Sequence, residues 1–91
     1  MGTVRREITI VNKLGLHARA AAKLVTVASA FDADVRLCRE DREVNAKSIM
    51  GVMMLAAGKG TRLEILATGK EAELAVDKLE ELVEDRFGEN E

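Results

Sequence analysis

The stretch DVRLCREDREVN, residues 34–45, decides the fold class of this chain. Residues 34–39 alternate between polar and apolar side chains, which predicts a strand with Val35 and Leu37 on one face. Glu40 and Asp41 predict a hairpin tip, and residues 42–45 predict a short return strand. Because strands joined by a tight hairpin pair antiparallel, this stretch argues against a doubly wound parallel sheet.

The segments on either side of the hairpin predict two further strands and three helices. Strand alternation covers residues 4–11 and 62–68, and apolar residues three and four apart predict helices at residues 17–30, 49–56 and 72–83. Residues 88–91 are expected to be frayed. The order is β-α-β-β-α-β-α, which predicts an α+β fold with helices on one face of a single sheet.

Composition limits the class of protein. The chain has 91 residues, 47% of them hydrophobic and 33% charged, and is expected to form one domain over residues 1–91. No apolar run reaches the roughly 18 residues of a membrane span, and no signal peptide is expected. A single cysteine, Cys38, fits a reducing cytoplasm. Having one histidine and one cysteine excludes metal sites that need several such ligands.

Charge is distributed unevenly along the chain. The first 70 residues are mildly basic, whereas residues 71–91 are strongly acidic. This pattern, with almost no aromatic residues, favours a bound anion or an acidic partner protein over nucleic acid.

His17 is the candidate nucleophile. It is the only histidine, it follows a loop containing Gly15, and it opens the helix expected at residues 17–30. The N–H groups in the first turn of a helix have no partner inside the helix and attract anions. With Arg19 two residues on, imidazole can attack phosphorus while the helix end and the guanidinium hold the oxygens. The alternative interpretation is a surface histidine that merely begins a helix.

The short helix behind Ser48 is the second candidate region. Ser48 is expected to be its N-cap. The spacing favours core packing for Ile49, Val52 and Met53. Met50 and Met54 share a different face, which is interpreted as an exposed apolar patch able to dock several partners.

Two runs of the sequence resemble the signatures of the HPr-type phosphocarrier family. NKLGLHARAAA, residues 12–22, is similar to the family's active-site signature, and AKSIMGVMML, residues 46–55, is similar to the signature around its regulatory serine. The resemblance covers nearly the whole chain and implies the HPr-like fold, an open-faced β-sandwich with a four-stranded antiparallel sheet and three helices on one face. The wording NKLGLHAR, the segment MMLAAGKG and the acidic end RFGENE look closer to the nitrogen-related branch, NPr, than to the sugar-transport branch.

The resemblance implies roles for individual residues. His17 corresponds to the phospho-acceptor, modified on Nδ1, with Ala18 and Arg19 binding the phosphate, and Ser48 to the target of a dedicated kinase in some bacteria. The implied partner-docking residues are Ala22, Lys23, Lys47, Ile49, Met50, Met53 and Met54. Ala20 stands where the family usually has proline, so the helix start lacks the pre-set φ of proline.

The implied function is phosphoryl transport by a protein that is not itself an enzyme. The chain would take phosphate from the phosphohistidine of an enzyme I, charged by phosphoenolpyruvate, and pass it to a histidine of an enzyme IIA. No cofactor, metal, nucleic acid or membrane is expected, and the expected state is a monomer. The alternatives are a sugar-transport HPr and a regulatory module switched by His17 phosphorylation. A ferredoxin-like nucleic-acid binder would need aromatic residues on its strands, but Phe31 and Phe87 fall at helix ends.

Overall fold

Residues 2–91 are described by the computed structural model, in which four strands form one antiparallel sheet. The elements are β1 (Thr3–Thr9), α1 (Ala18–Ser29), β2 (Asp34–Arg39), β3 (Arg42–Asn45), α2 (Ile49–Met54), β4 (Arg62–Thr68), α3 (Ala72–Glu84) and a 3-10 turn at Arg86–Gly88. The predicted α+β fold and the antiparallel sheet are confirmed.

The sheet runs in the order β1-β4-β2-β3. The predicted hairpin joins β2 to β3, with Arg39 opposite Arg42 and Glu40 in a left-handed conformation at the tip. Alternate residues of β2 and β4 point into the core, where Val35 pairs with Ala67 across the two strands. β1 ends at Thr9, two residues before the predicted end at residue 11.

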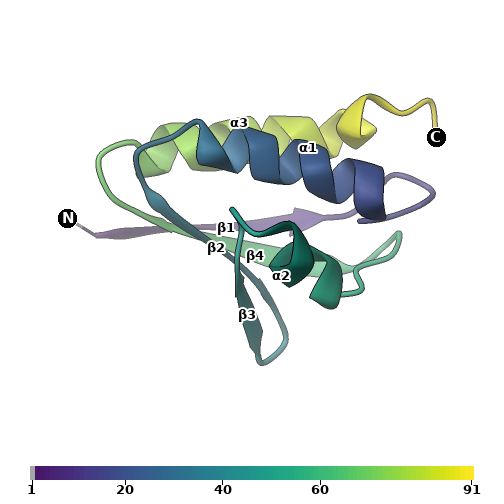
Figure 1. Cartoon of the computed structure of the whole chain (residues 1–91), viewed down its shortest axis with the longest axis horizontal. Coiled ribbons are helices and arrows are strands. Elements are labelled where there is room, and N and C mark those ends of the chain that lie inside the picture. Colours follow the sequence, from purple (N-terminus) through teal and green to yellow (C-terminus); the bar gives the residue numbers. More distant parts are fainter. Residues whose placement is uncertain (1) are drawn as a thin grey trace.

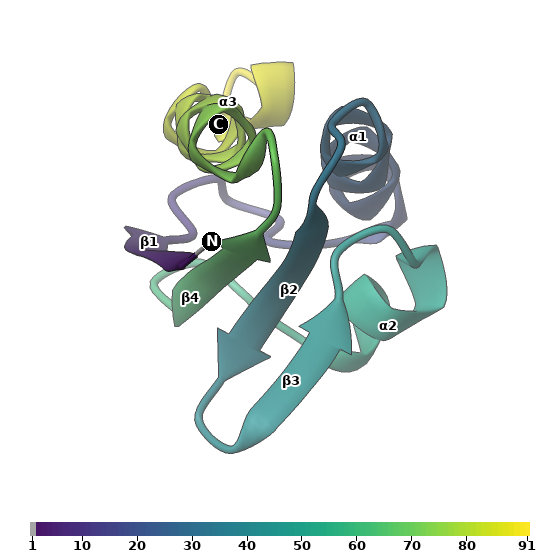
Figure 2. The same cartoon turned by 90° about the vertical axis from the view of Figure 1, so that its left-hand side faces the viewer.

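The helices lie on one side of the sheet. α1 and α3 run side by side across it, and α2 packs against α1 beside β3 (Figures 1 and 2). The apolar stripes of α1 and α3 close the core over the sheet, as their spacing predicts. Their fully buried residues include Leu24, Ala28, Ala75, Val76 and Leu79. Among residues 2–91, no helix combines the length and the hydropathy needed to span a bilayer.

The short helix α2 is held at both ends. The Ser48 hydroxyl accepts a hydrogen bond from the Gly51 N–H at 3.1 Å, which confirms the predicted N-cap. At the other end the Arg39 guanidinium donates to the carbonyls of Leu55 and Ala56, at 2.7 and 2.9 Å. Cationic donors at a helix C-terminus satisfy its free carbonyls, so the β2–β3 hairpin fixes the position of α2.

The C-terminal segment contradicts the prediction of a frayed end. Phe87, in a left-handed conformation, is fully buried, and the residues after it lie against the loop before α1. The Lys13 N–H donates to the Glu91 carbonyl, and the Lys13 ammonium lies 3.5 Å from the Glu91 carboxylate. We call residues 89–91 the tail strap. Tertiary contacts that the local pattern does not encode order this strap.

Candidate functional site

His17 caps the N-terminus of α1. Its backbone is extended, with φ −73° and ψ 178°, and its Nδ1 atom accepts a hydrogen bond from the Arg19 N–H at 3.3 Å. The side chain is 29% exposed. Nδ1 therefore faces the helix end, where the first-turn N–H groups lack intrahelical partners. α1 begins at Ala18, so Ala20 lies in its first turn.

The loop before His17 is fixed by close packing. Gly15 has φ +67°, and a Cβ added to it would lie 2.6 Å from the Ala57 carbonyl oxygen. The next residue, Leu16, donates its N–H to that same carbonyl at 2.8 Å. Only glycine combines this left-handed backbone with so close an approach, so Gly15 sets where His17 enters the helix.

Glu89 of the tail strap lies on the far side of the His17 ring. Its Oε2 atom is 2.6 Å from His17 Nε2, and its Oε1 atom accepts from Asn12 Nδ2 at 3.0 Å. The hydrogen bond from Asn12, and after it the contact with His17, lower the pKa of Glu89 below its ordinary value of 4.5. The sequence interpretation missed both Asn12 and Glu89. The sequence signal available for them was that residues 12–22 and residues 86–91 each carry polar side chains that belong to no helical or strand periodicity.

Arg19 supplies the cation at the site. Its side chain is exposed and its guanidinium makes no hydrogen bond or ion pair within residues 2–91. Arg19 and His17 line a shallow depression of about 460 Å³. The other lining residues are Lys13, Leu14, Glu89, Asn90 and Glu91. The depression thus joins an imidazole, a helix N-terminus and the Arg19 guanidinium, a combination suited to an anionic group.

The outer side of α2 is an apolar surface. Met50 is 76% exposed and Met54 66%, as predicted, but Ile49 and Met53 are also exposed, at 44% and 42%. The expectation of core packing for Ile49 and Met53 is therefore wrong, and within α2 only Val52 is buried. A six-residue helix held at the edge of the sheet turns only a narrow face inward. These four side chains, Ile49, Met50, Met53 and Met54, form what we call the α2 patch.

The two lysines named among the implied partner-docking residues both donate hydrogen bonds to backbone carbonyls. The Lys23 ammonium donates to the Phe87 carbonyl at 2.6 Å, and the Lys47 ammonium donates to the Phe31 carbonyl at 3.0 Å. Ala22 is half-buried on α1. The two ammonium groups therefore hold chain turns in place, a role that sequence alone did not indicate.

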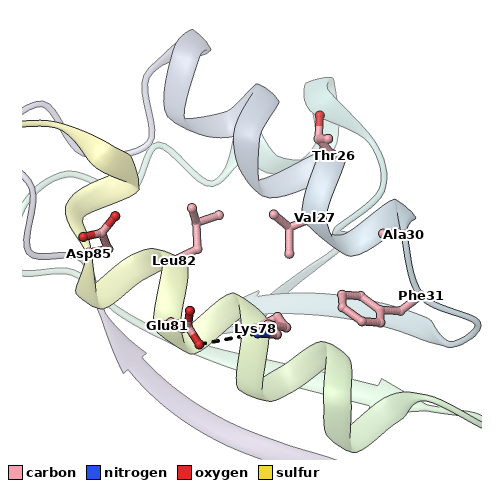
Figure 3. Close-up of a pocket in the computed structure, with 8 residues that line it drawn as sticks. All are labelled: Thr26, Val27, Ala30, Phe31, Lys78, Glu81, Leu82 and Asp85. Atoms are coloured by element: carbon pink, nitrogen blue, oxygen red, sulfur yellow. Dashed lines mark ion pairs between the residues drawn. The ribbon is translucent and has the colours of Figure 1, made fainter.

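A larger pocket, of about 690 Å³, lies between α1 and α3 (Figure 3). Val27 and Leu82 face each other across it, and Lys78 and Glu81 form an ion pair along α3 at 3.8 Å. Among residues 2–91, neither histidine nor cysteine contributes to its lining. Its chemistry is that of an apolar groove between two helices, unlike the anionic-group site at His17.

Fold and site together define a class of small α+β proteins that present one histidine at a helix N-terminus. The family model described as "PTS HPr component phosphorylation site" matches residues 4–85. The phosphocarrier protein HPr of Cupriavidus necator is 51% identical over 88 residues, covering 97% of this chain and 99% of that relative. The phosphocarrier protein NPr of Shewanella violacea is 42% identical over 89 residues, covering 98% of each.

A solved structure agrees with these relatives. The crystal structure of HPr-C-His from Thermoanaerobacter tengcongensis has a TM-score of 0.91 and 42% identity, with 100% of both chains covered. The chain therefore belongs to the HPr family of phosphocarrier proteins of the phosphotransferase system. The HPr-like fold expected from the sequence is confirmed.

Proposed function

We propose that this chain carries phosphate on His17, as the substrate of two partner enzymes rather than as an enzyme. The observation that supports this most directly is the placement of His17 Nδ1 at the N-terminus of α1, in the same depression as Arg19. The donor is the phosphohistidine of an enzyme I charged by phosphoenolpyruvate, and the acceptor is a histidine of an enzyme IIA. Location in the cytoplasm and a monomeric state stay predictions.

The proposed transfer step takes place at Nδ1 of His17. The Nδ1 lone pair attacks the donor's phosphorus, and the donor P–N bond breaks as its imidazole leaves with the electron pair. The Arg19 N–H, which donates to Nδ1 at 3.3 Å before transfer, is then available to a phosphoryl oxygen. The Ala18 N–H and the Arg19 guanidinium supply further donors to the phosphoryl group. Transfer to the acceptor histidine reverses the step.

The α2 patch is the proposed docking surface for both partners, and Ala22, Lys23 and Lys47 are proposed to contact the partners as well. Methionine side chains are flexible and polarizable, so one patch can fit two differently shaped partners. Ser48 lies at the start of the same helix. A phosphate on Ser48 would add about two negative charges beside the patch, which is the proposed regulatory effect of a Ser48-directed kinase.

We assign the chain to the nitrogen-related branch. The relative named NPr and the runs NKLGLHAR, MMLAAGKG and RFGENE support this assignment. The second candidate is the sugar-transport branch, which the higher identity to the HPr of Cupriavidus necator favours. A purely regulatory module switched by His17 phosphorylation is the third.

Phosphorus NMR tests the proposed function. The protein is mixed with phosphoenolpyruvate and, in separate tubes, with an enzyme I of the sugar branch or of the nitrogen branch. We expect an acid-labile phosphoramidate signal that is absent for His17→Ala and slower to appear for Arg19→Gln. The enzyme I that phosphorylates the protein faster identifies the branch. Folded wild-type protein that gives no signal with either enzyme would contradict the carrier function and leave a phosphate-independent binding module.

A further inference from the structure

The two nitrogens of the His17 ring have opposite hydrogen-bonding roles. Nδ1 faces the Arg19 N–H, a donor, so Nδ1 must offer a lone pair. Nε2 lies 2.6 Å from a Glu89 carboxylate oxygen, an acceptor, so Nε2 must carry the proton. Both contacts therefore select the same neutral tautomer, with hydrogen on Nε2.

Asn12 holds the Glu89 carboxylate in this position. Its Nδ2 donates to Glu89 Oε1 at 3.0 Å and to the Gly15 carbonyl at 2.9 Å, and two acceptors on one side fix the orientation of the amide. Asn12 is fully buried, and its Oδ1 atom finds no partner within residues 2–91. A buried acceptor without a partner costs stability. The arrangement that leaves Asn12 Oδ1 without a partner is the same one that places the Glu89 carboxylate beside His17.

Two anchors keep the carboxylate in place. Before Glu89, the Lys23 ammonium binds the Phe87 carbonyl. After it, Lys13 pairs with Glu91 through both backbone and side chain. The Glu89 side chain is only 15% exposed, so water does not readily replace it at Nε2.

We propose that Glu89 is a positioning residue for phosphoryl transfer, holding His17 as the Nε2–H tautomer with the Nδ1 lone pair at the N-terminus of α1. This proposal rests on the proposed function of His17. When Nδ1 forms its bond to phosphorus, the ring becomes a cation that keeps its Nε2 proton. The Glu89 carboxylate, across the ring from the phosphoryl group, stabilises that cation without touching the phosphate. A carboxylate behind a histidine acts in the same way in hydrolase triads.

The tautomer can be read directly, because His17 is the only histidine of the chain. Long-range proton–nitrogen correlation spectra of untagged, nitrogen-15-labelled protein distinguish a protonated from an unprotonated ring nitrogen. We expect the Nε2–H form in the wild type and in Glu89→Gln, whose amide oxygen still accepts. Glu89→Ala is expected to give a mixture of tautomers. Glu84→Ala, which removes an exposed carboxylate of α3, is the matched control and is expected to match the wild type.

Transfer rates provide the second readout. Phosphorylation by the active enzyme I is expected to slow by about 10-fold in Glu89→Ala, at the low end of the effect of carboxylates that orient histidines. Glu89→Gln should be intermediate, since it keeps the tautomer and loses the charge. The loss should appear in kcat rather than in KM, because Glu89 lies behind the ring and away from the α2 patch.

The outcomes separate this proposal from the carrier function. A Glu89→Ala spectrum identical to that of the wild type would overturn the proposal, as would a changed tautomer with an unchanged rate. Wild-type protein that shows the Nε2–H form but accepts no phosphate would contradict the carrier function, and with it any role of Glu89 in transfer. A cooperative heat-unfolding transition shows that each variant is folded. If Glu89→Ala does not fold, the nearly isosteric Glu89→Gln variant replaces it in the rate measurement.

Discussion

Lys23 and Phe87 are 64 residues apart in sequence, yet the Lys23 ammonium donates a 2.6 Å hydrogen bond to the Phe87 carbonyl. Phe87 is buried with φ +56°, a conformation that bulky side chains rarely adopt. The bond joins α1 to the turn from which the tail strap leaves. The placement of Glu89 against His17 therefore depends on a lysine that follows His17 by six residues on the same helix.

Replacing Lys23 by methionine should loosen this turn. Hydrogen bonds from charged donors stabilise proteins by about 1.5–3 kcal/mol, and the exposure of Lys23 puts the expected loss at the low end of that range. Urea unfolding measures the loss, and amide exchange at residues 88–91 should become faster. Lys78→Met is the control, since the Lys78 ammonium makes only an exposed 3.8 Å pair with Glu81. Equal losses of unfolding free energy in Lys23→Met and Lys78→Met would argue against the Lys23–Phe87 hydrogen bond as an anchor of the tail strap.

Gly15→Ala is expected to be among the most damaging small substitutions in the chain. The new Cβ would meet the Ala57 carbonyl oxygen at 2.6 Å and the Gly58 Cα at 2.7 Å, in addition to the left-handed strain of about 1–2 kcal/mol. Gly60→Ala has the same kind of backbone strain, with φ +89°, but nothing within 4 Å of the added atom. The difference in unfolding free energy between the two variants isolates the clash. If Gly15→Ala and Gly60→Ala lose equal unfolding free energy, the loop before His17 can move enough to relieve the clash.

The contacts of the Glu89 carboxylate with Asn12 and His17 should contribute less to stability at acidic pH. The folded state lowers the pKa of Glu89 below 4.5, so its carboxylate stabilises the fold at pH values above 4.5. That contribution is lost as the pH falls through the lowered pKa. Carbon NMR titration of the Glu89 carboxyl group should show the lowered midpoint, and Asn12→Ala should raise it toward the ordinary value. Identical midpoints in the two proteins would contradict the assignment of Asn12 as the main cause.

A negative charge at Ser48 should weaken docking without unfolding the protein. Aspartate and asparagine both cap helices well, so Ser48→Asp and Ser48→Asn should retain the heat-unfolding midpoint of the wild type. Only Ser48→Asp places a charge beside the α2 patch. Its phosphorylation by enzyme I should be slower than that of Ser48→Asn. Equal rates in the two variants, both folded, would remove the proposed regulation.

The features that sequence predicted well are those encoded by neighbouring residues. The alternation in residues 34–39 and the polar tip after it were enough for the β2–β3 hairpin. Ser48 could be recognised as a helix cap because a cap acts within three residues of itself, and His17 could be recognised as the residue that opens a helix. The role of Nδ1 as the phosphorylated atom was implied by the resemblance to the HPr family and not by these local features.

The features that sequence missed depend on contacts between distant segments. Asn12 and Glu89 meet only because the chain folds back after α3, and no periodicity marks either residue. The exposure of Ile49 and Met53 likewise depends on how the Arg39 guanidinium holds α2 at the sheet edge. A helical pattern shows which side chains share a face, but which face turns inward is decided by packing.

The tail strap also decides where a label or tag can be attached. Figure 1 shows the C-terminus and the beginning of β1 toward opposite ends of the long axis, with the C-terminus beyond the start of α1. Residues added after Glu91 would extend from the rim of the depression that holds His17. A fluorophore or an immobilising surface joined before β1 leaves that rim open to large partners, so kinetic measurements belong on amino-terminally attached protein.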